Sequence, residues 1–430
     1  MRKSCINTFL DENKLSAGSI DEDEFLSFFL SEMKGGLEGG KSSLMMIPTY
    51  QGIDGKIGDG ARVIVLDLGG TNFRSCLVTF KDGGKPLISN FKKVPMPGSG
   101  KEIDKKGFYS TLADNIESLL DYSDSIGLCF SYAATILENH DGVPMEFSKE
   151  VKAPEVVGTH LGASLIDELG KRGHLTKDIT VSVVNDTVAT LLAAKAECPE
   201  NASSYIGFIL GTGTNTAYLE DSGNIRKISP RSGKMIINVE SGCLDAPLGA
   251  LDRAFWKTTQ DESAHRLEKA ISGAYLGPLS HFVIKSAIDD GFFSKSFREK
   301  FSSLDSLSTT EMSHYLEMPL NQNYILPSII DDEDDAYILY RILDSIIDRA
   351  SKLTAVNLTA SILKTGYGEN PRYPVVINAD GTTFYKTKNL DVYTKSYLWN
   401  LLEKKHGRYF KMVNIDNSPV LGAAIAGCLR

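Results

Sequence analysis

One short glycine- and threonine-containing pattern occurs twice in this chain, once in each half. The first copy covers residues 63–74 (VIVLDLGGTNFR) and the second covers residues 205–215 (YIGFILGTGTN). In each copy an apolar, β-branched run predicts a buried strand, and the small residues after it allow a tight turn. Such a turn brings backbone N–H groups and threonine hydroxyls close to phosphate oxygens. One Gly-Thr-Gly turn alone is also typical of a plain β-hairpin, but two of them predict two like-folded lobes that hold one nucleotide between them.

Length and charge limit the partners of such a protein. With 430 residues the chain is long enough for two domains that each have a core. The formal net charge of −9 argues against nucleic acid or an anionic membrane as the main partner, because both require a basic footprint. Phosphorylated ligands would then be bound by local N–H groups and by single lysine or arginine side chains.

The cysteines and the N-terminal segment favour a reducing compartment. The six cysteines are widely spaced and include no Cys-x-x-Cys pair, which is typical of reduced thiols. Polar residues interrupt the segment after Met1, and no apolar run approaches the ~20 residues that a bilayer span requires. We therefore expect a cytoplasmic protein without a membrane partner.

The alternation of strand and helix patterns predicts a layered α/β fold. An amphipathic helix at 21–34 comes before the first strand hairpin at 62–80, and strands and helices then alternate before the pattern restarts near residue 187. The last part of the chain is more helical. The expected elements are helices at 107–121, 159–170 and 187–196, a helix pair at 336–365, and strands at 125–131, 179–184, 374–378 and 410–414.

Two further patterns suggest sites that their context does not favour. Residues 35–42 (GGLEGGKS) match the P-loop expression, but a P-loop follows a strand and opens a helix, whereas this segment follows a helix and soon reaches Pro48. The acidic run 331–335 (DDEDD) resembles a metal site. It directly precedes an apolar-periodic helix, so we expect a solvated helix start whose charges are stabilised by the helix dipole.

Some polar residues are open to two interpretations from sequence alone. Asn185 and Asp186 follow a strand and precede a helix, so they are candidates either for a helix N-cap or for a functional carboxylate and amide. Glu268 lies on the apolar stripe of its helix, which suggests either a buried hydrogen-bonding role or a salt bridge at the edge of the core. Lys149 by itself is typical of a surface lysine.

Taken together, the motifs resemble those of the hexokinases, within the sugar-kinase/actin-like ATPase superfamily. The run 67–74 (DLGGTNFR) is the first phosphate motif of that family, and the resemblance extends from the Glu32 region and residues 47–50 (IPTY) to the C-terminal 422–424 (GAA). It implies a two-domain, actin-like (ribonuclease H-like) α/β fold with a cleft between the domains, and we expect a single-unit hexokinase of the bacterial type. The expected small domain spans 61–184 and is completed by a helix at 417–430, and the large domain comprises 1–60 and 187–416.

The resemblance also implies roles for the sugar-facing residues. Asp186 would be the general base that accepts the proton of the 6-hydroxyl, and Lys149 would donate to the sugar near the reacting oxygen. Residue 241 is a serine where the family carries Trp or Tyr after the glutamate, which predicts the loss of an aromatic wall near the pocket. The complete set of residues expected to contact the sugar is Ser131, Ser148, Lys149, Asn185, Asp186, Asn215, Glu240 and Glu268.

On the nucleotide side, the resemblance implies ATP carried with Mg²⁺. The metal would have no direct protein ligand, and Asp67 would be its outer-shell partner. The stretch 416–424 (DNSPVLGAA) departs from the family's glycine-rich sequence near the adenosine, which predicts weak discrimination between purine nucleotides. The residues expected to contact the nucleotide are Asp67, Gly69, Gly70, Thr71, Asn72, Arg74, Gly211, Thr212, Gly213, Asp380, Gly381 and Thr382.

The expected activity is therefore ATP-dependent phosphorylation of a hexose, with glucose the expected sugar, at its 6-hydroxyl. Closure of the cleft around the sugar would align the reacting groups and exclude water. The alternative is a non-catalytic protein that senses sugar with the same pocket. We expect a monomer or a homodimer.

Overall fold

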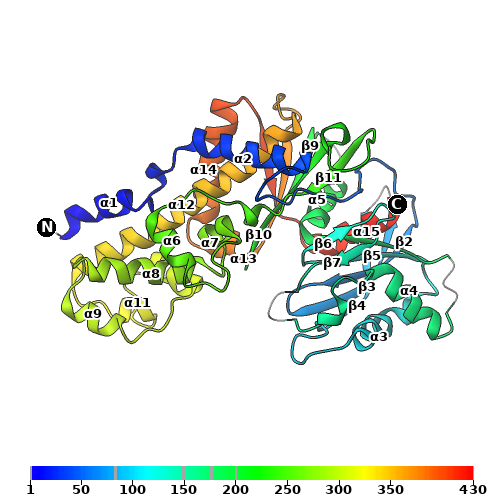
Figure 1. The fold of residues 1–430 in the computed structure, drawn as a ribbon, viewed down its shortest axis with the longest axis horizontal. Coiled ribbons are helices and arrows are strands. Elements are labelled where there is room, and N and C mark those ends of the chain that lie inside the picture. The colour runs from blue at the N-terminus through cyan, green and yellow to red at the C-terminus, as the bar shows by residue number, and fades with distance from the viewer. Residues whose placement is uncertain (1, 82–84, 148–150, 175–177, 199–200, 430) are drawn as a thin grey trace.

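Two β-sheets organise the chain in the computed structural model, which describes residues 2–81, 85–147, 151–174, 178–198 and 201–429 (Figure 1). The first sheet has the order β4-β3-β2-β5-β8 and the second β1-β11-β10-β9-β12-β13. A two-stranded ribbon, β6-β7, is separate from both. The strands are β1 (Ile47–Pro48), β2 (Arg62–Leu68), β3 (Asn72–Lys81), β4 (Lys85–Pro95), β5 (Ser125–Phe130), β6 (Ala134–Ile136), β7 (Gly142–Pro144), β8 (Thr180–Val184), β9 (Ser204–Leu210), β10 (Thr214–Asp221), β11 (Lys234–Asn238), β12 (Val375–Asp380) and β13 (Phe410–Val413).

The two sheets repeat one topology. If the five main strands of each sheet are numbered along the chain, both sheets have the spatial order third, second, first, fourth, fifth. In both, the first two strands form an antiparallel hairpin and the fourth pairs parallel with the first. The two glycine-threonine turns join the strands of these hairpins, at equivalent places. The sequence repeat therefore reflects the two like-folded halves that it predicts.

Two helices, α5 (Asp186–Glu197) and α15 (Ser418–Cys428), pack against each other between the sheets. Their close contact depends on Gly422, since a Cβ at this position would lie 2.0 Å from the backbone oxygen of Ala189. The C-terminal helix, red in Figure 1, also packs on β2 and β5 of the first sheet. The N-terminal half of the chain is thus completed by its last helix, although the domain boundaries themselves stay a prediction.

The remaining helices surround the second sheet and flank the first. Helices α3 and α4 pack together beside the first sheet, and most of the others build a large helical layer on the second (Figure 1). They are α1 (Arg2–Glu12), α2 (Glu22–Glu38), α3 (Lys105–Ile116), α4 (Leu161–Lys171), α6 (Ala250–Trp256), α7 (Arg266–Ile271), α8 (Leu276–Asp289), α9 (Lys295–Phe301), α10 (Thr309–Glu317), α11 (Ile325–Ser328), α12 (Glu333–Thr365), α13 (Thr382–Lys386), α14 (Leu390–Leu398) and a π-helical turn at Trp399–Lys405.

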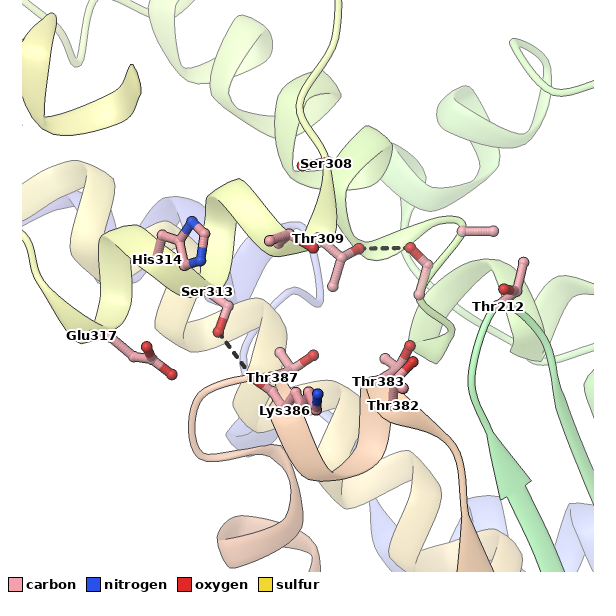
Figure 2. A pocket seen from close by; sticks show the side chains of 13 residues that line it. Thr212, Ser308, Thr309, Ser313, His314, Glu317, Thr382, Thr383, Lys386 and Thr387 are labelled. Atoms are coloured by element: carbon pink, nitrogen blue, oxygen red, sulfur yellow. Dashed lines mark hydrogen bonds between the residues drawn. The ribbon is translucent and has the colours of Figure 1, made fainter. Parts of the chain in front are cut away.

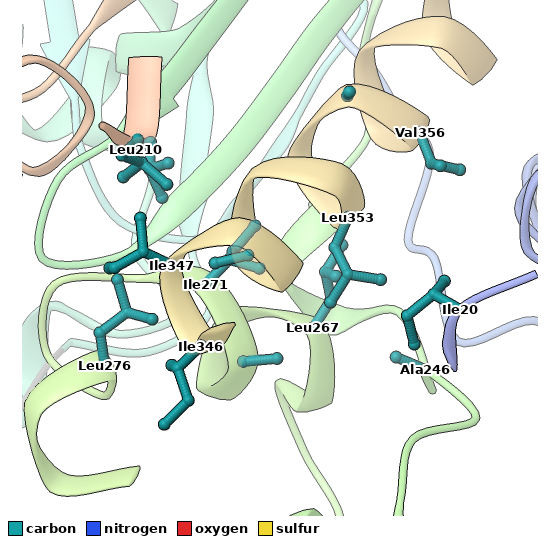
Figure 3. Close-up of a cluster of buried hydrophobic side chains, with 14 of the residues drawn as sticks. Ile20, Leu210, Ala246, Leu267, Ile271, Leu276, Ile346, Ile347, Leu353 and Val356 are labelled. Atoms are coloured by element: carbon teal, nitrogen blue, oxygen red, sulfur yellow. The ribbon is translucent and has the colours of Figure 1, made fainter. Parts of the chain in front are cut away.

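Helix α12 is the axis of the largest hydrophobic core. Its side chains Ile346, Ile347 and Leu353 are fully buried and lie beside Leu267 and Ile271 of α7 (Figure 3). Burying side chains of this size contributes about 1.5–3 kcal/mol each. This core holds α7, and with it Glu268, in a fixed place beside the second sheet.

The predicted helix pair at 336–365 is wrong, because α12 is one helix of 33 residues. Residues 333–365 contain no glycine or proline that would interrupt it. The helix begins as expected, with the Asp332 carboxylate accepting from the N–H groups of Asp334 and Asp335. Asp335 itself is buried rather than solvated, and it accepts a hydrogen bond from the N–H of Ser294 at 2.9 Å.

The P-loop-like segment is the end of a helix. Gly35 and Gly36 belong to the last turns of α2, and Gly39 closes the helix in the left-handed conformation with φ of 73°. The side chain of Lys41 is exposed. No strand leads into this segment among the described residues, so the discarded P-loop interpretation is confirmed as false.

Candidate active site

The turn between β2 and β3 is built from Gly69, Gly70 and Thr71. The Gly69 N–H donates to the oxygen of Asn72 at 3.1 Å, and the Asn72 side-chain amide donates to the Thr71 hydroxyl at 2.8 Å. Gly70 and Thr71 are exposed, and a Cβ on Gly70 would meet no atom within 4 Å. The turn therefore borders open space on the side where a ligand would approach.

Asp67 and Arg74 face each other across this hairpin. Arg74 Nη1 lies 2.8 Å from Asp67 Oδ2, and the two residues are paired in the strand register. Burial raises the pKa of Asp67, while the neighbouring guanidinium acts to lower it. Arg74 was expected at the phosphates, but in this structure it is bound to Asp67 and only about a third of its side chain is exposed, 37%.

The turn between β9 and β10 is held from three sides. Within it, the Gly211 N–H donates to Gly213 O at 2.9 Å. The Thr383 hydroxyl donates to Gly211 O at 2.8 Å, and the Ala274 N–H donates to Thr212 O at 3.1 Å. These contacts fix the direction of the turn relative to α13 and α8.

Gly213 and Glu268 approach each other closely. A Cβ on Gly213 would lie 2.6 Å from Glu268 Oε2, and the same oxygen accepts from the Thr214 N–H at 3.0 Å. Burial raises the pKa of Glu268. The glycine that the sequence assigned to phosphate contact is thus needed to admit the Glu268 carboxylate, and Glu268 has the inward, hydrogen-bonding place that was one of its two interpretations.

Asp186 is the first residue of α5, directly after the N-cap. Asn185 is that N-cap, and its side chain accepts from the Thr187 N–H at 2.9 Å. The same N–H lies 2.8 Å from Asp186 Oδ1. Burial raises the pKa of Asp186 to about 6, and the Asp67 charge adds to this, while hydrogen bonds from Thr187 and Ser131 act against it. The N-cap interpretation therefore holds for Asn185, and a functional role for the Asp186 carboxylate stays a prediction.

Glu240 lies opposite, at the end of β11. It has the left-handed conformation, with φ of 53°, and its Oε1 accepts from the Asn238 side-chain amide at 2.8 Å. Burial, together with the charges of Asp186 and Glu268, raises its pKa to about 7. The carboxyl groups of Asp186 and Glu268, from two other elements, are thus close enough to affect the ionisation of Glu240.

Asn215 completes this group and is anchored by two further residues. Its side-chain amide donates to Asn238 Oδ1 at 2.8 Å, and its own Oδ1 accepts from the Thr216 N–H at 2.7 Å. Asn238 therefore links Asn215 to Glu240. The sequence reasoning did not identify Asn238, although an asparagine inside the otherwise apolar strand 235–239 is the signal that would have singled it out.

Residue 241, at which the loss of an aromatic wall near the pocket was expected, lies in the interior, and that expectation stays a prediction. Ser241 is fully buried, and its hydroxyl lies 3.2 Å from the Thr216 hydroxyl and 3.4 Å from the Asn357 side-chain amide. Asn357 comes from α12 and also donates to the Thr216 hydroxyl at 2.8 Å. The serine is part of a buried polar network behind Asn215.

A cavity of about 480 Å³ opens beside the second turn. Thr212 lies at one end of it, and Thr382 and Thr383 project from α13 on the facing side (Figure 2). Hydroxyls dominate the wall, and Lys386, His314 and Glu317 provide the charged or titratable groups. Its lining residues are Thr212, Gly273, Ala274, Ser308, Thr309, Thr310, Ser313, His314, Glu317, Thr382, Thr383, Lys386 and Thr387.

The segment 380–382 joins this cavity to the second turn. Gly381 has φ of 119°, and a Cβ on it would lie 2.3 Å from the oxygen of Leu210. Asp380 is near enough to Asp67 to raise the pKa of that carboxyl. The charge of Asp380 thus acts on Asp67, and the charge of Asp67 acts in turn on Asp186.

Some of the predicted site residues do not join this arrangement. Ser148 and Lys149 lie outside the described residues. The stretch 416–421 contributes no residue to the lining of the cavity within the described part of the chain. Val420 and Leu421 are buried in the core between the sheets, and Ser418 binds the Asn378 side-chain amide at 2.9 Å.

The fold is the two-domain, actin-like α/β fold, with an equivalent hairpin turn in each of its two main sheets. Two family models described as hexokinase match the chain, one over residues 6–196 and the other over residues 205–429. The chain therefore belongs to the hexokinase family.

The relatives of this chain include hexokinases of animals. The hexokinase of Schistosoma mansoni is 28% identical over 442 residues, covering 96% of this chain and 94% of the relative. Hexokinase-1 of Mus musculus is 28% identical over 391 residues, which cover 82% of this chain but 38% of the mouse protein. The chain spans about two fifths of the length of the mammalian relatives that it matches. The expectation of a bacterial type is not borne out.

Solved structures agree on the fold. The structure of the Schistosoma mansoni hexokinase complexed with glucose has a TM-score of 0.77 at 24% identity, covering 100% of this chain and 99% of that one. A second hexokinase crystal structure has a TM-score of 0.78 at 19% identity, covering 99% and 100%. No described helix is long and apolar enough to cross a membrane.

Proposed function

We propose that this protein transfers the γ-phosphoryl group of MgATP to the 6-hydroxyl of a hexose, with glucose as the first substrate to test. The observation that carries the proposal is the position of Asp186. A half-buried carboxyl whose pKa is raised to about 6 lies between a group of sugar-compatible amides and carboxylates and the two glycine-threonine turns. Such a group is ionised at neutral pH and basic enough to accept a hydroxyl proton.

The sugar end of the site matches the chemistry of a polyol. Carboxylates accept hydrogen bonds from hydroxyl groups, and amides both donate and accept them. Glu240, Glu268 and Asn215 present these groups from three elements, and Asn238 fixes two of them. Asn185 is less suited to a sugar contact, because its side-chain oxygen is engaged as the N-cap of α5. Roles for Ser131, Ser148 and Lys149 at the sugar stay predictions.

The nucleotide end fits ATP that carries its own Mg²⁺. Among the described residues no three His, Cys, Asp or Glu side chains form a group that could hold a metal. An ion carried by ATP would be bound mainly through phosphate oxygens and water. Asp67 and Asp380 are near enough for the Asp380 charge to act on Asp67, and both would meet the waters of such an ion. When bound, the ion would neutralise charge on the phosphates. The hydroxyl-lined cavity at Thr212 and Thr382 would take the nucleoside (Figure 2).

A coupled assay for ADP release tests the proposal directly. ADP should appear with MgATP and glucose together, and its rate without a hexose should be far lower, because only the sugar completes the site. A panel of glucose, mannose, fructose, glucosamine and N-acetylglucosamine would identify the preferred substrate. Detection of a phosphorylated hexose that keeps a free anomeric centre would place the new phosphate away from carbon 1.

Two variants sharpen the assay. Asp186→Ala should lower kcat about 10²–10⁴-fold while hexose binding, followed by calorimetry, weakens far less. Lys41→Ala is the matched control, since its side chain is exposed on the false P-loop. A protein that bound hexose but released no ADP with any sugar would support the sugar-sensing alternative instead.

A further inference from the structure

Tyr132 connects the loop after β5 to the first phosphate turn. Its hydroxyl donates to the carbonyl oxygen of Gly69 at 3.1 Å and to that of Gly70 at 3.3 Å. Both acceptors belong to the glycine turn itself, 62 and 63 residues away in the chain. The hydroxyl thus holds two consecutive peptide groups of the turn from one side.

The orientation of those two peptide groups determines the direction of two backbone donors, the N–H groups of Gly70 and Thr71. In a trans peptide the C=O of one residue and the N–H of the next point in opposite directions, and the described chain contains no cis peptide. Holding the oxygens of Gly69 and Gly70 toward Tyr132 therefore turns the N–H groups of Gly70 and Thr71 away from it. Gly70 also borders open space, since a Cβ on it would meet nothing within 4 Å.

The ring of Tyr132 is itself fixed. It is 9% exposed and packs against Phe130 and Phe147, with ring centroids 5.2 and 5.1 Å apart. The preceding residue, Ser131, is bound to the hairpin of β2 and β3, because its N–H donates to Leu68 O at 3.1 Å. A rigid aromatic base with one hydroxyl at its tip is well suited to setting the direction of a flexible diglycine.

We propose that the Tyr132 hydroxyl is a positioning group that aims the N–H donors of Gly70 and Thr71 at the phosphates of the nucleotide. This inference rests on the proposed function, which places the phosphates of ATP at this turn. Tyr132 need not touch the nucleotide, because it acts through the peptide groups of the turn. Its removal should therefore weaken nucleotide binding and leave hexose binding largely intact.

The variant Tyr132→Phe removes the hydroxyl and keeps the ring. A hydrogen bond of this kind contributes modestly, so the dissociation constant for a Mg²⁺ complex of the non-hydrolysable analogue AMP-PNP should rise about three- to tenfold. KM for ATP should rise by a similar factor, and the dissociation constant for glucose should change less than about twofold. Isothermal titration calorimetry and initial rates on the full chain measure these quantities.

The chain offers a matched control in Tyr109→Phe. Tyr109 is 2% exposed and belongs to the same hydrophobic core. Its hydroxyl lies 2.6 Å from the Thr159 hydroxyl, so the variant loses a comparable hydrogen bond. It lies on α3 and does not bond to the turn. A general loosening of the core should appear in both variants, whereas the effect on the nucleotide should appear in Tyr132→Phe alone.

The outcomes are distinct. Selective weakening of AMP-PNP binding in Tyr132→Phe supports the proposal. Unchanged AMP-PNP binding, or equal weakening of nucleotide and glucose, overturns it. If the wild-type protein phosphorylates no hexose but binds AMP-PNP, the proposed function fails while the comparison of binding still decides the role of Tyr132. If the wild-type protein does not bind AMP-PNP, both proposals fail.

Discussion

The raised pKa of Asp186 makes the acid limb of the activity profile predictable. At a pKa of about 6 the carboxyl group is half protonated at pH 6, and about nine tenths of it is ionised at pH 7 but only about one tenth at pH 5. A protonated carboxyl cannot accept the hydroxyl proton. The kcat/KM for hexose should thus fall about tenfold from pH 7 to pH 5. Glu240, with a pKa of about 7 in the same cleft, should make the limb steeper than a single ionisation.

The same shift in pKa predicts an effect on stability. The folded protein keeps a proton on Asp186 at pH values between about 3.8 and 6, where the unfolded chain has released it. Its contribution to stability is therefore most favourable below pH 3.8 and is lost as the pH rises through 6. At about 1.36 kcal/mol per pKa unit, the loss is at most about 3 kcal/mol. Asp186→Asn cannot ionise, so it should be more stable than the wild type at pH 8, by about 1–3 kcal/mol, and equally stable near pH 4.

Urea unfolding of both proteins at pH 8 and near pH 4, together with a pH profile of kcat/KM, checks the two consequences. The Asn variant should be nearly inactive and more stable at pH 8, because the carboxylate that serves as the base is also the group that burial disfavours. An acid limb near pH 4, or an Asn variant that is less stable than the wild type at pH 8, would refute the reasoning from burial.

Three further predictions follow from other parts of the structure. Lys41→Ala should leave kcat and KM for ATP within about twofold, whereas Thr212→Ala should raise KM for ATP severalfold, and the reverse pattern would revive the P-loop. Ser241→Trp should lower the urea midpoint, because the serine is fully buried between Thr216 and Asn357 and overpacking there should reduce the free energy of unfolding by about 1–3 kcal/mol or more. An unchanged midpoint would contradict this. Initial rates should favour ATP over GTP or ITP by less than about tenfold, or ~1.4 kcal/mol, because the hydroxyls of the cavity both donate and accept, and a hundredfold preference would exclude this account.

Much of the fold was predictable because the local signals agreed with the global arrangement. The β-branched runs before each glycine-threonine turn form the first strands of the two sheets, and the small-residue turns join them to their partners. The helix at 336–365 was misread as two, since apolar periodicity gives no sign of where a long helix stops without glycine or proline. The burial of Asp335 depends on Ser294, a contact with another helix that no local pattern reveals.

The site was predictable to the extent that its residues lie in the turns and at strand ends. Asp186 follows β8 of the first sheet and Glu240 follows β11 of the second, and the charge of Asp186 acts on Glu240. The supporting contacts were not predictable in this way. Asn238 and Asn357 act through side-chain amides that meet partners from distant segments, and Arg74 binds Asp67 across the hairpin. Such pairings are set by strand register and helix packing.

The C-terminal departure from the family pattern takes on a different meaning in the structure. Pro419 stands at the first turn of α15, where its missing N–H has no helical partner to lose. Val420 and Leu421 add apolar bulk to the core that α15 shares with α5. Because α15 packs on β2 and β5 of one sheet while α5 packs on β9 and β12 of the other, the contact between these helices joins the two sheets. The residues at 420–421 therefore belong to the core that holds the sheets together, and among the described residues the stretch 416–421 supplies none that lines the cavity assigned to the nucleoside.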